Sequence, residues 1–296
     1  MAHRHTHSSR HKDRLWAVLA LSAAFMLVQV IVGWWTNSLA LLADAAHLFV
    51  DTAGVGLSLL AVWFAERPAT PEKTYGYYRV EILAALVNGV VLCVLAIVIL
   101  VEAWRRLSVP HEVTAGPVLV VAVAALGVNL LAAMLLHKGA GESLNVRSAY
   151  LEVLGDALSS GAVIVAALVI LVTGWTAADA LASAAIGLLI LPRTYSLLKQ
   201  AVNVLLEGVP PHLDLGEIEQ ALHGAAGVKR VHDLHVWTLT SGREAMSAHV
   251  EVERGTPPAQ VLDELHVILH ARFGIDHTTI QIETQAPALL QIAPRR

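Results

Sequence analysis

Six long apolar runs before about residue 200 constrain the fold of this chain more than any other feature. A helix needs roughly 20 apolar residues to cross the hydrocarbon core of a bilayer, and each run approaches or exceeds that length. Because no water is present in that core, the backbone of each run must satisfy its own N–H and C=O groups, as a helix does. The six expected membrane helices are residues 15–35, 39–65, 82–104, 118–136, 148–172 and 177–197.

The composition indicates a membrane protein and excludes a soluble globular one. The mean hydropathy is +0.61, and only 15% of the residues are charged, against roughly 25% in soluble domains. The formal net charge of −4 gives no basis for a nucleic-acid partner. The sole cysteine, Cys93, falls inside the third run, so neither a disulfide framework nor a thiolate cluster is expected. No Walker A motif is present, and we expect no resident cofactor.

Basic residues orient the chain in an inner (plasma) membrane. The first run follows several basic residues and is too long for a cleaved signal peptide, so we interpret it as a membrane helix. Basic residues also gather after the second and fourth runs, which places these segments and both termini in the cytoplasm. Arg105 and Arg106, after the third run, are the exception. The cytoplasmic basic residues are Arg67, Lys73, Arg79, Lys138 and Arg147.

A polar stretch follows the last apolar run and predicts a second, water-exposed domain. Residues 213–223 and 258–272 have helical spacing, whereas strand-type alternation marks residues 228–239, 245–253 and 276–283. The order αββαβ predicts a small α+β domain, with one sheet covered by helices on one face. The expected parts are a His-rich cytoplasmic tail (1–14), a six-helix transmembrane domain (15–208), a cytoplasmic α+β domain (209–285) and a C-terminal tail (286–296).

Two pairs of ionisable residues lie inside the apolar runs and are the strongest local signal for function. His47 and Asp51 are four residues apart in the second run and share a helix face, and Glu152 and Asp156 repeat this spacing in the fifth. Ionisable groups within membrane helices are costly and mark functional sites. Two such pairs could form the tetrahedral set of nitrogen and oxygen ligands that zinc favours. We interpret Asp44, near the start of the second run, as structural.

Four motifs, in the right order, resemble the cation diffusion facilitator family along nearly the whole chain. They are SLALLAD (38–44), YGYYRVE (75–81), LNVR (144–147) and VHDLHVW (231–237). The resemblance implies a bacterial zinc, cobalt and cadmium efflux transporter that works as a homodimeric, proton-coupled antiporter. It also implies six membrane helices and a metallochaperone-like cytoplasmic domain.

The sequence departs from the family pattern at two places. Glu152 stands where the zinc members usually have histidine. One nitrogen and three carboxylates form a harder donor set than two of each, which widens the range of acceptable metals. Tyr77 and Tyr78 stand where relatives often carry histidine, so no metal site is expected in that loop.

The resemblance also implies a regulatory metal site in the cytoplasmic domain. Its candidate ligands are His232, His249, His277 and Glu283. His235 is excluded, because regular strand alternation would put it on the face opposite His232.

A charge pair between Arg79 and Glu207 is implied at positions that resemble the family's interlock between the membrane and cytoplasmic parts. The alternative is an anchoring arginine and an exposed carboxylate, whose pairing would contribute little.

The expected function is proton-coupled export of divalent transition-metal ions, Zn²⁺ first and then Cd²⁺, Co²⁺ or Ni²⁺. Metal ions, protons and the bilayer are its expected partners. Metal and protons compete for the same atoms, because His47 must be neutral and the carboxylates ionised before they bind metal. The sequence lacks the His-Glu-x-x-His and Gly-x-Ser-x-Gly motifs of membrane enzymes. An exporter of Mn²⁺ or Fe²⁺, and a metal-gated channel or sensor without proton coupling, are the alternatives.

Overall fold

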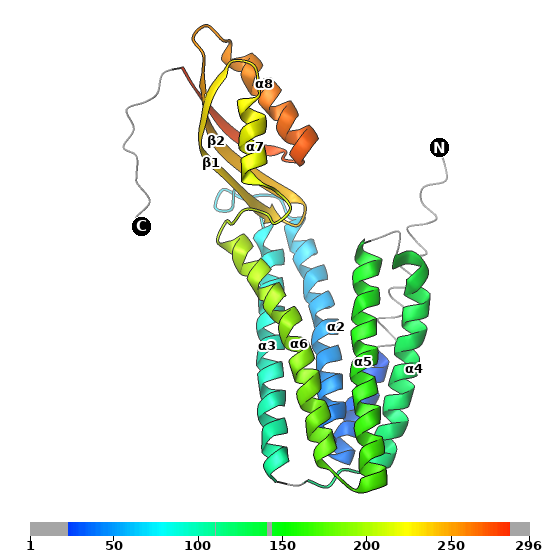
Figure 1. Cartoon of the computed structure of the whole chain (residues 1–296). Helices are drawn as coiled ribbons and strands as arrows, with labels where there is room; N and C mark the ends of the chain where they lie inside the picture. The colour runs from blue at the N-terminus through cyan, green and yellow to red at the C-terminus, as the bar shows by residue number, and fades with distance from the viewer. Residues whose placement is uncertain (1–22, 110, 141–143, 285–296) are drawn as a thin grey trace, which may run out of the picture. The chain divides into compact units, whose positions relative to one another are not determined.

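The computed structural model describes residues 23–109, 111–140 and 144–284 (Figure 1). The chain divides into two compact units. Of the described residues, the first unit comprises those within 1–60 and 84–198, and the second comprises those within 61–83 and 199–296. Helices α2, α3 and α6 therefore contribute residues to both units.

The first unit is built from long apolar helices, and the chain is a multi-pass membrane protein. In the described residues, five helices are long and apolar enough to span a membrane, and a shorter apolar helix, Ala23–Thr36, precedes them. They match the second to sixth expected runs, although the last helix extends eight residues further; the first expected run lies partly outside the described residues. The five are α2 (Leu39–Ala65), α3 (Arg79–Ser108), α4 (Ala115–Ala140), α5 (Leu144–Thr173) and α6 (Ala177–Leu205).

Small side chains form much of the buried surface between these helices. Small residues let helix backbones approach closely, which favours association where lipid removes the hydrophobic driving force. Large apolar side chains such as Trp104, which is 73% exposed, lie on the outside, where lipid tails would cover them. The most deeply buried alanines include Ala40, Ala96, Ala122 and Ala167.

Asp179, at the start of α6, fastens that helix to the start of α2. One carboxylate oxygen accepts a hydrogen bond from the Ser38 hydroxyl at 2.6 Å, and the other accepts from the backbone N–H of Leu39 at 2.7 Å. A carboxylate at a helix N-terminus satisfies free N–H groups and interacts favourably with the helix dipole. The two helices thus share one anchored end.

Arg106 explains why basic residues follow the third apolar run. Its guanidinium donates to the backbone carbonyl of Asn37 at 2.7 Å and to the side-chain oxygen of Asn37 at 3.1 Å. Asn37 has a φ of 56°, in the left-handed region that asparagine tolerates better than most residues. Arg106 therefore stabilises the turn before α2, which is a structural reason for a basic residue on this side.

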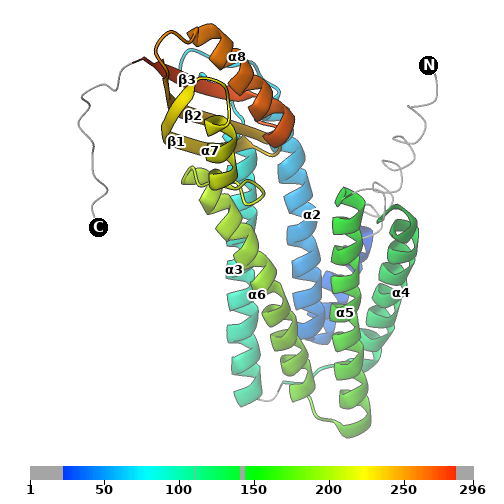
Figure 2. The same cartoon turned by 45° about the horizontal axis from the view of Figure 1, so that its top comes forward.

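The second unit contains a three-stranded sheet in the order β1-β2-β3 (Figure 2). The strands are β1 (Val228–Thr240), β2 (Arg243–Val252) and β3 (His277–Glu283). β1 and β2 are antiparallel, whereas β2 and β3 are parallel and are connected through α8.

Helices α7 (Leu215–His223) and α8 (Pro258–Ile268) pack on one face of this sheet, and a π-helical turn, Leu269–Phe273, follows α8 (Figure 2). Asp214 caps α7 by accepting from the backbone N–H of Gly216 at 2.7 Å. The shared core includes Ile218 and Leu222 of α7, Met246 of β2 and Leu265 of α8. The predicted αββαβ fold is therefore confirmed.

Candidate functional site

Three ionisable side chains meet inside the helical unit. The Nε2 atom of His47 lies 3.4 Å from an Asp51 carboxylate oxygen on the next turn of α2 and 3.7 Å from an Asp156 oxygen on α5. One ligand atom from each residue lies within 4.8 Å of the others. The side chains are only 12%, 11% and 13% exposed, so the cluster is inside the helix bundle.

Two polar atoms of this cluster have unused bonding capacity. His47 Nδ1 and Asp51 Oδ2 are buried, and neither takes part in a hydrogen bond with the described residues. A buried polar atom without a partner costs free energy, and at a functional site it indicates a ligand or ion. Imidazole nitrogen and carboxylate oxygen are donors that suit a divalent transition metal.

Glu152, the fourth expected ligand, is not part of this three-residue cluster. Its carboxylate instead lies 3.0 Å from the Arg193 guanidinium of α6. The Glu152 side chain is 31% exposed, more than twice as much as the three clustered residues. Glu152 also interacts with Asp51, a member of the cluster.

Arg193 is not among the site residues predicted from the sequence. It falls within the sixth expected run, where the high average hydropathy conceals a single charge. The signal was nevertheless present, because an arginine inside a membrane helix calls for an acidic partner.

Asp44 lies beside the cluster with a structural partner. Its side chain accepts a hydrogen bond from Gln29 at 2.5 Å, and the residue is only 6% exposed. Asp44, Asn129 and Asp156 also line a small cavity of about 10 Å³. That volume is close to the minimum for one water molecule.

A second cluster lies on the sheet of the other unit. His249 Nδ1 is 2.9 Å from one Glu283 oxygen, and His232 Nε2 is 3.5 Å from the other. The ladder explains this proximity: His232 pairs with His249, and Glu283 pairs with Glu251, two residues further along β2. Glu283 is buried at 4% exposure, whereas the histidines are 30% and 25% exposed.

A β-bulge after His232 overturns the face assignment made for His235. Asp233 has a φ of 50°, and the register shifts between His232 and His235. His235 pairs with Ser247 and His232 with His249, so both histidines lie on one face of the sheet. His235 still stays out of the cluster, since its Nε2 atom lies 3.0 Å from Asp233.

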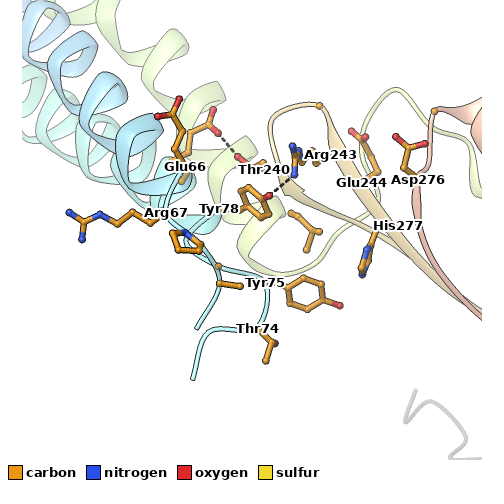
Figure 3. Close-up of a pocket in the computed structure, with 18 residues that line it drawn as sticks. Glu66, Arg67, Thr74, Tyr75, Tyr78, Thr240, Arg243, Glu244, Asp276 and His277 are labelled. Atoms are coloured by element: carbon orange, nitrogen blue, oxygen red, sulfur yellow. Dashed lines mark hydrogen bonds between the residues drawn. The ribbon is translucent and has the colours of Figure 1, made fainter. Parts of the chain in front are cut away.

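His277, at the start of β3, is not brought into this cluster. Its ring lies 5.5 Å from the Tyr75 ring, measured between centroids. It lines a cavity of about 870 Å³ within the second unit (Figure 3).

Arg79 and Glu207 form the expected ion pair, with 2.7 Å between Arg79 Nη2 and Glu207 Oε1. Both side chains are well exposed, at 41% and 60%. Exposed pairs of this kind contribute at most about 1 kcal/mol.

Further hydrogen bonds, which no sequence motif predicted, link residues near the start of α3 to the β1–β2 turn and the start of β2. Glu81 accepts hydrogen bonds from the hydroxyl groups of Thr240 and Ser241 at the β1–β2 turn. Arg243 donates to the Tyr78 hydroxyl at 2.5 Å, and Figure 3 shows both side chains at the cavity. The loop tyrosine Tyr78 therefore has a structural contact.

Relatives match the chain along nearly its full length. The metal cation efflux system protein CzcD of Cupriavidus metallidurans is 45% identical, over 95% of this chain and 89% of the relative. The zinc transporter ZitB of Escherichia coli is 43% identical over 96% and 93%, and the cadmium, cobalt and zinc/H(+)-K(+) antiporter of Bacillus subtilis is 38% identical over 97% and 93%.

A solved metal-bound C-terminal domain of a CzcD transporter is 43% identical and covers 24% of this chain and 99% of its own length. Its TM-score is 0.23, too low to carry a structural argument.

Family models match both parts of the chain. The cation efflux transmembrane domain matches residues 15–206, and the cytoplasmic domain of cation efflux proteins matches residues 210–285. The chain therefore belongs to the cation efflux family, which is the cation diffusion facilitator family that its motifs resemble.

Proposed function

We propose that this protein is a proton-coupled antiporter that exports divalent transition-metal ions from the cytoplasm across the inner (plasma) membrane. The observation that carries the proposal is the buried cluster of His47, Asp51 and Asp156 on two apolar helices. Membership of an efflux family favours a transporter over a membrane enzyme. Both termini are assigned to the cytoplasm on the distribution of basic residues.

Metal and protons compete directly at this cluster. A divalent ion binds when His47 is neutral and the carboxylates are ionised. Facing the cytoplasm, the cluster releases protons and binds metal; facing a more acidic exterior, it takes up protons and releases the metal. The pH gradient thereby drives export.

Zn²⁺ is the first substrate that we assign, with Cd²⁺, Co²⁺ and Ni²⁺ as further cargo. Zinc accepts the mixed nitrogen and oxygen donors of His47, Asp51 and Asp156. Two relatives bear names that include zinc, ZitB and the Bacillus antiporter, and the latter name also includes protons. A donor set dominated by oxygen would instead favour Mn²⁺. Preferential transport of Mn²⁺ would therefore support the alternative that the protein exports Mn²⁺ or Fe²⁺.

The cytoplasmic cluster is assigned a regulatory role. His232, His249 and Glu283 offer three ligand atoms within 4.8 Å of one another. Residues 210–285 match the family model of the cytoplasmic domain, and the name of that model includes the word dimer. This match supports a homodimer. We therefore assign transport to residues 15–208 and metal-dependent regulation to residues 209–285; the tails 1–14 and 286–296 lie outside the described residues.

Transport into proteoliposomes tests this function. Purified protein is reconstituted, an acidic interior is imposed, and entry of Zn²⁺, Cd²⁺, Co²⁺ and Mn²⁺ is followed with an internal metal-sensitive dye. We expect Zn²⁺ to accumulate above its external concentration and to stop accumulating when a protonophore collapses the gradient. Accumulation that survives the collapse would refute proton coupling, and simple equilibration would indicate a channel.

A further inference from the structure

Arg193 places a fixed positive charge beside the candidate transport site. It lies near the middle of α6 and follows Pro192, a residue that cannot donate a helical backbone hydrogen bond. Its Nη2 atom is 3.0 Å from a Glu152 oxygen. Its charge also acts on Asp51 and Asp156.

An arginine within a membrane helix needs a nearby carboxylate, because an unpaired guanidinium in hydrocarbon is costly. Glu152 supplies that carboxylate from α5. Glu152 pairs with Arg193 and also contacts Asp51, but it is not one of the three residues whose ligand atoms converge, whereas His47 Nδ1 and Asp51 Oδ2 are buried without hydrogen bonds to described residues. The ion pair and the metal ligands are therefore distinct parts of one site.

The formal charges are consistent with this division. With His47 neutral, the three carboxylates of Asp51, Glu152 and Asp156 together with the Arg193 guanidinium carry a charge of −2. Two carboxylates and two neutral histidines would carry the same charge. Arg193 thus cancels the extra negative charge that Glu152 introduces, and the site matches a divalent cation.

We propose that Arg193 determines the affinity and selectivity of the site by neutralising Glu152 and holding it apart from the metal. His47, Asp51 and Asp156 are then the protein ligands of the metal, and Glu152 is the partner of Arg193. This inference rests on the proposed transport function. It also means that replacing Glu152 or Arg193 alone should change the metal affinity, whereas replacing both together should preserve it.

Metal binding to the full-length protein in detergent tests the inference without requiring transport. Isothermal titration with Zn²⁺ and Mn²⁺ is performed in a His232→Ala/His249→Ala background, so that the cytoplasmic cluster does not contribute. The variants are Glu152→Gln, Arg193→Gln and the double variant. Glutamine has no charge and is a poor zinc ligand, so the double variant separates a charge partner from a metal ligand.

Glu152→Gln should weaken Zn²⁺ binding by about tenfold or more, because Arg193 is left uncompensated beside the metal. Arg193→Gln should strengthen binding and shift the preference towards Mn²⁺, because Glu152 is freed to act as a third carboxylate. The double variant restores the charge of −2 and should bind Zn²⁺ within roughly threefold of the background protein. If Arg193→Gln proves unstable, Arg193→Lys is measured in its place. This variant keeps the positive charge and should retain the Zn²⁺ affinity.

A double variant that binds as weakly as Glu152→Gln would overturn the inference, since Glu152 would then be a ligand. Unchanged affinity in both Glu152→Gln and Arg193→Gln would show that no charge compensation exists, and a large loss of affinity in Arg193→Lys would show that the positive charge alone does not account for the role of Arg193. Arg105→Gln makes the same chemical change at an arginine that is 73% exposed, and it should leave binding unaltered.

These outcomes separate this inference from the proposed function. If the background protein binds Zn²⁺ and loses it on Asp51→Ala, the transport site stands even when the Glu152 and Arg193 effects are additive. If Asp51→Ala has no effect on binding, the transport site itself is misassigned.

Discussion

The two candidate metal clusters use similar donors in different surroundings. In the helical unit, His47, Asp51 and Asp156 are each about one-eighth exposed, and an arginine lies close by. On the sheet, His232 and His249 are 30% and 25% exposed around a Glu283 carboxylate that already contacts both. The first arrangement suits an ion that must be bound and then released, and the second suits an ion sampled from water.

The largest expected effect is the loss of transport in Asp51→Ala. This change removes a buried carboxylate from a cluster of three, and with it the charge needed to hold a divalent ion. Zn²⁺ accumulation in proteoliposomes should fall to the level of protein-free vesicles, whereas Asp263→Asn, an exposed change on α8, should transport normally. Substantial Zn²⁺ accumulation by Asp51→Ala would contradict the assignment of transport to the buried cluster and of regulation to the sheet cluster.

A smaller, graded effect is expected from His249→Ala. Loss of this ligand should reduce the transport rate several-fold without abolishing it, since the intramembrane ligands are intact. Stopped-flow dye measurements over a range of Zn²⁺ concentrations check this. Complete loss of transport in a folded His249→Ala protein would mean that the sheet cluster is indispensable rather than regulatory.

Breaking the Arg79–Glu207 pair should have a still smaller effect. An exposed pair contributes at most about 1 kcal/mol, so Glu207→Gln should lower the thermal midpoint of the protein only slightly. Reversing both charges, Arg79→Glu with Glu207→Arg, should recover most of what Arg79→Glu loses. A reversal that recovers nothing would show that one of these residues acts through another contact.

The smallest effect concerns Glu251 on β2. A hydrogen bond from Lys229, together with its positive charge, lowers the pKa of Glu251 below its usual value. A lowered pKa stabilises the fold above the unfolded-state pKa, and this stabilisation is lost as the pH falls through the folded-state pKa. Lys229→Met should therefore reduce the thermal midpoint slightly at pH 7, and the difference from wild type should shrink towards pH 3; a constant difference would contradict it.

The sequence predicted elements whose signals are periodic. Apolar runs define α2 to α6, because lipid imposes a minimum helix length, and the spacing of His47 and Asp51 guarantees a shared face within one helix. The strands of the second unit likewise follow from alternation. These signals are local, so they survive without knowledge of the tertiary contacts.

Features that the sequence did not predict arise where partners are remote or where strand alternation is interrupted. Glu152 stays a predicted metal ligand, and its ion-pair partner, Arg193, was not anticipated because it lies on another helix. His235 was misplaced because the bulge at Asp233 adds a residue to one strand. Neither an interhelical contact nor a bulge has a periodic signature.

The hydrogen bonds from the start of α2 to Asp179 hold the first turns of α2 and α6 together, so that both helices can tilt about one shared end. At 1.5 Å rise per residue, His47 lies about 12 Å along α2 from Leu39, and Arg193 lies about 21 Å along α6 from Asp179. A tilt of α2 and α6 against α5 about this shared end would displace Arg193 nearly twice as far as His47. Asp51, about 18 Å along α2 from Leu39, would move nearly as far as Arg193, so the ion pair with Glu152 and the Asp51 ligand would separate from α5 together.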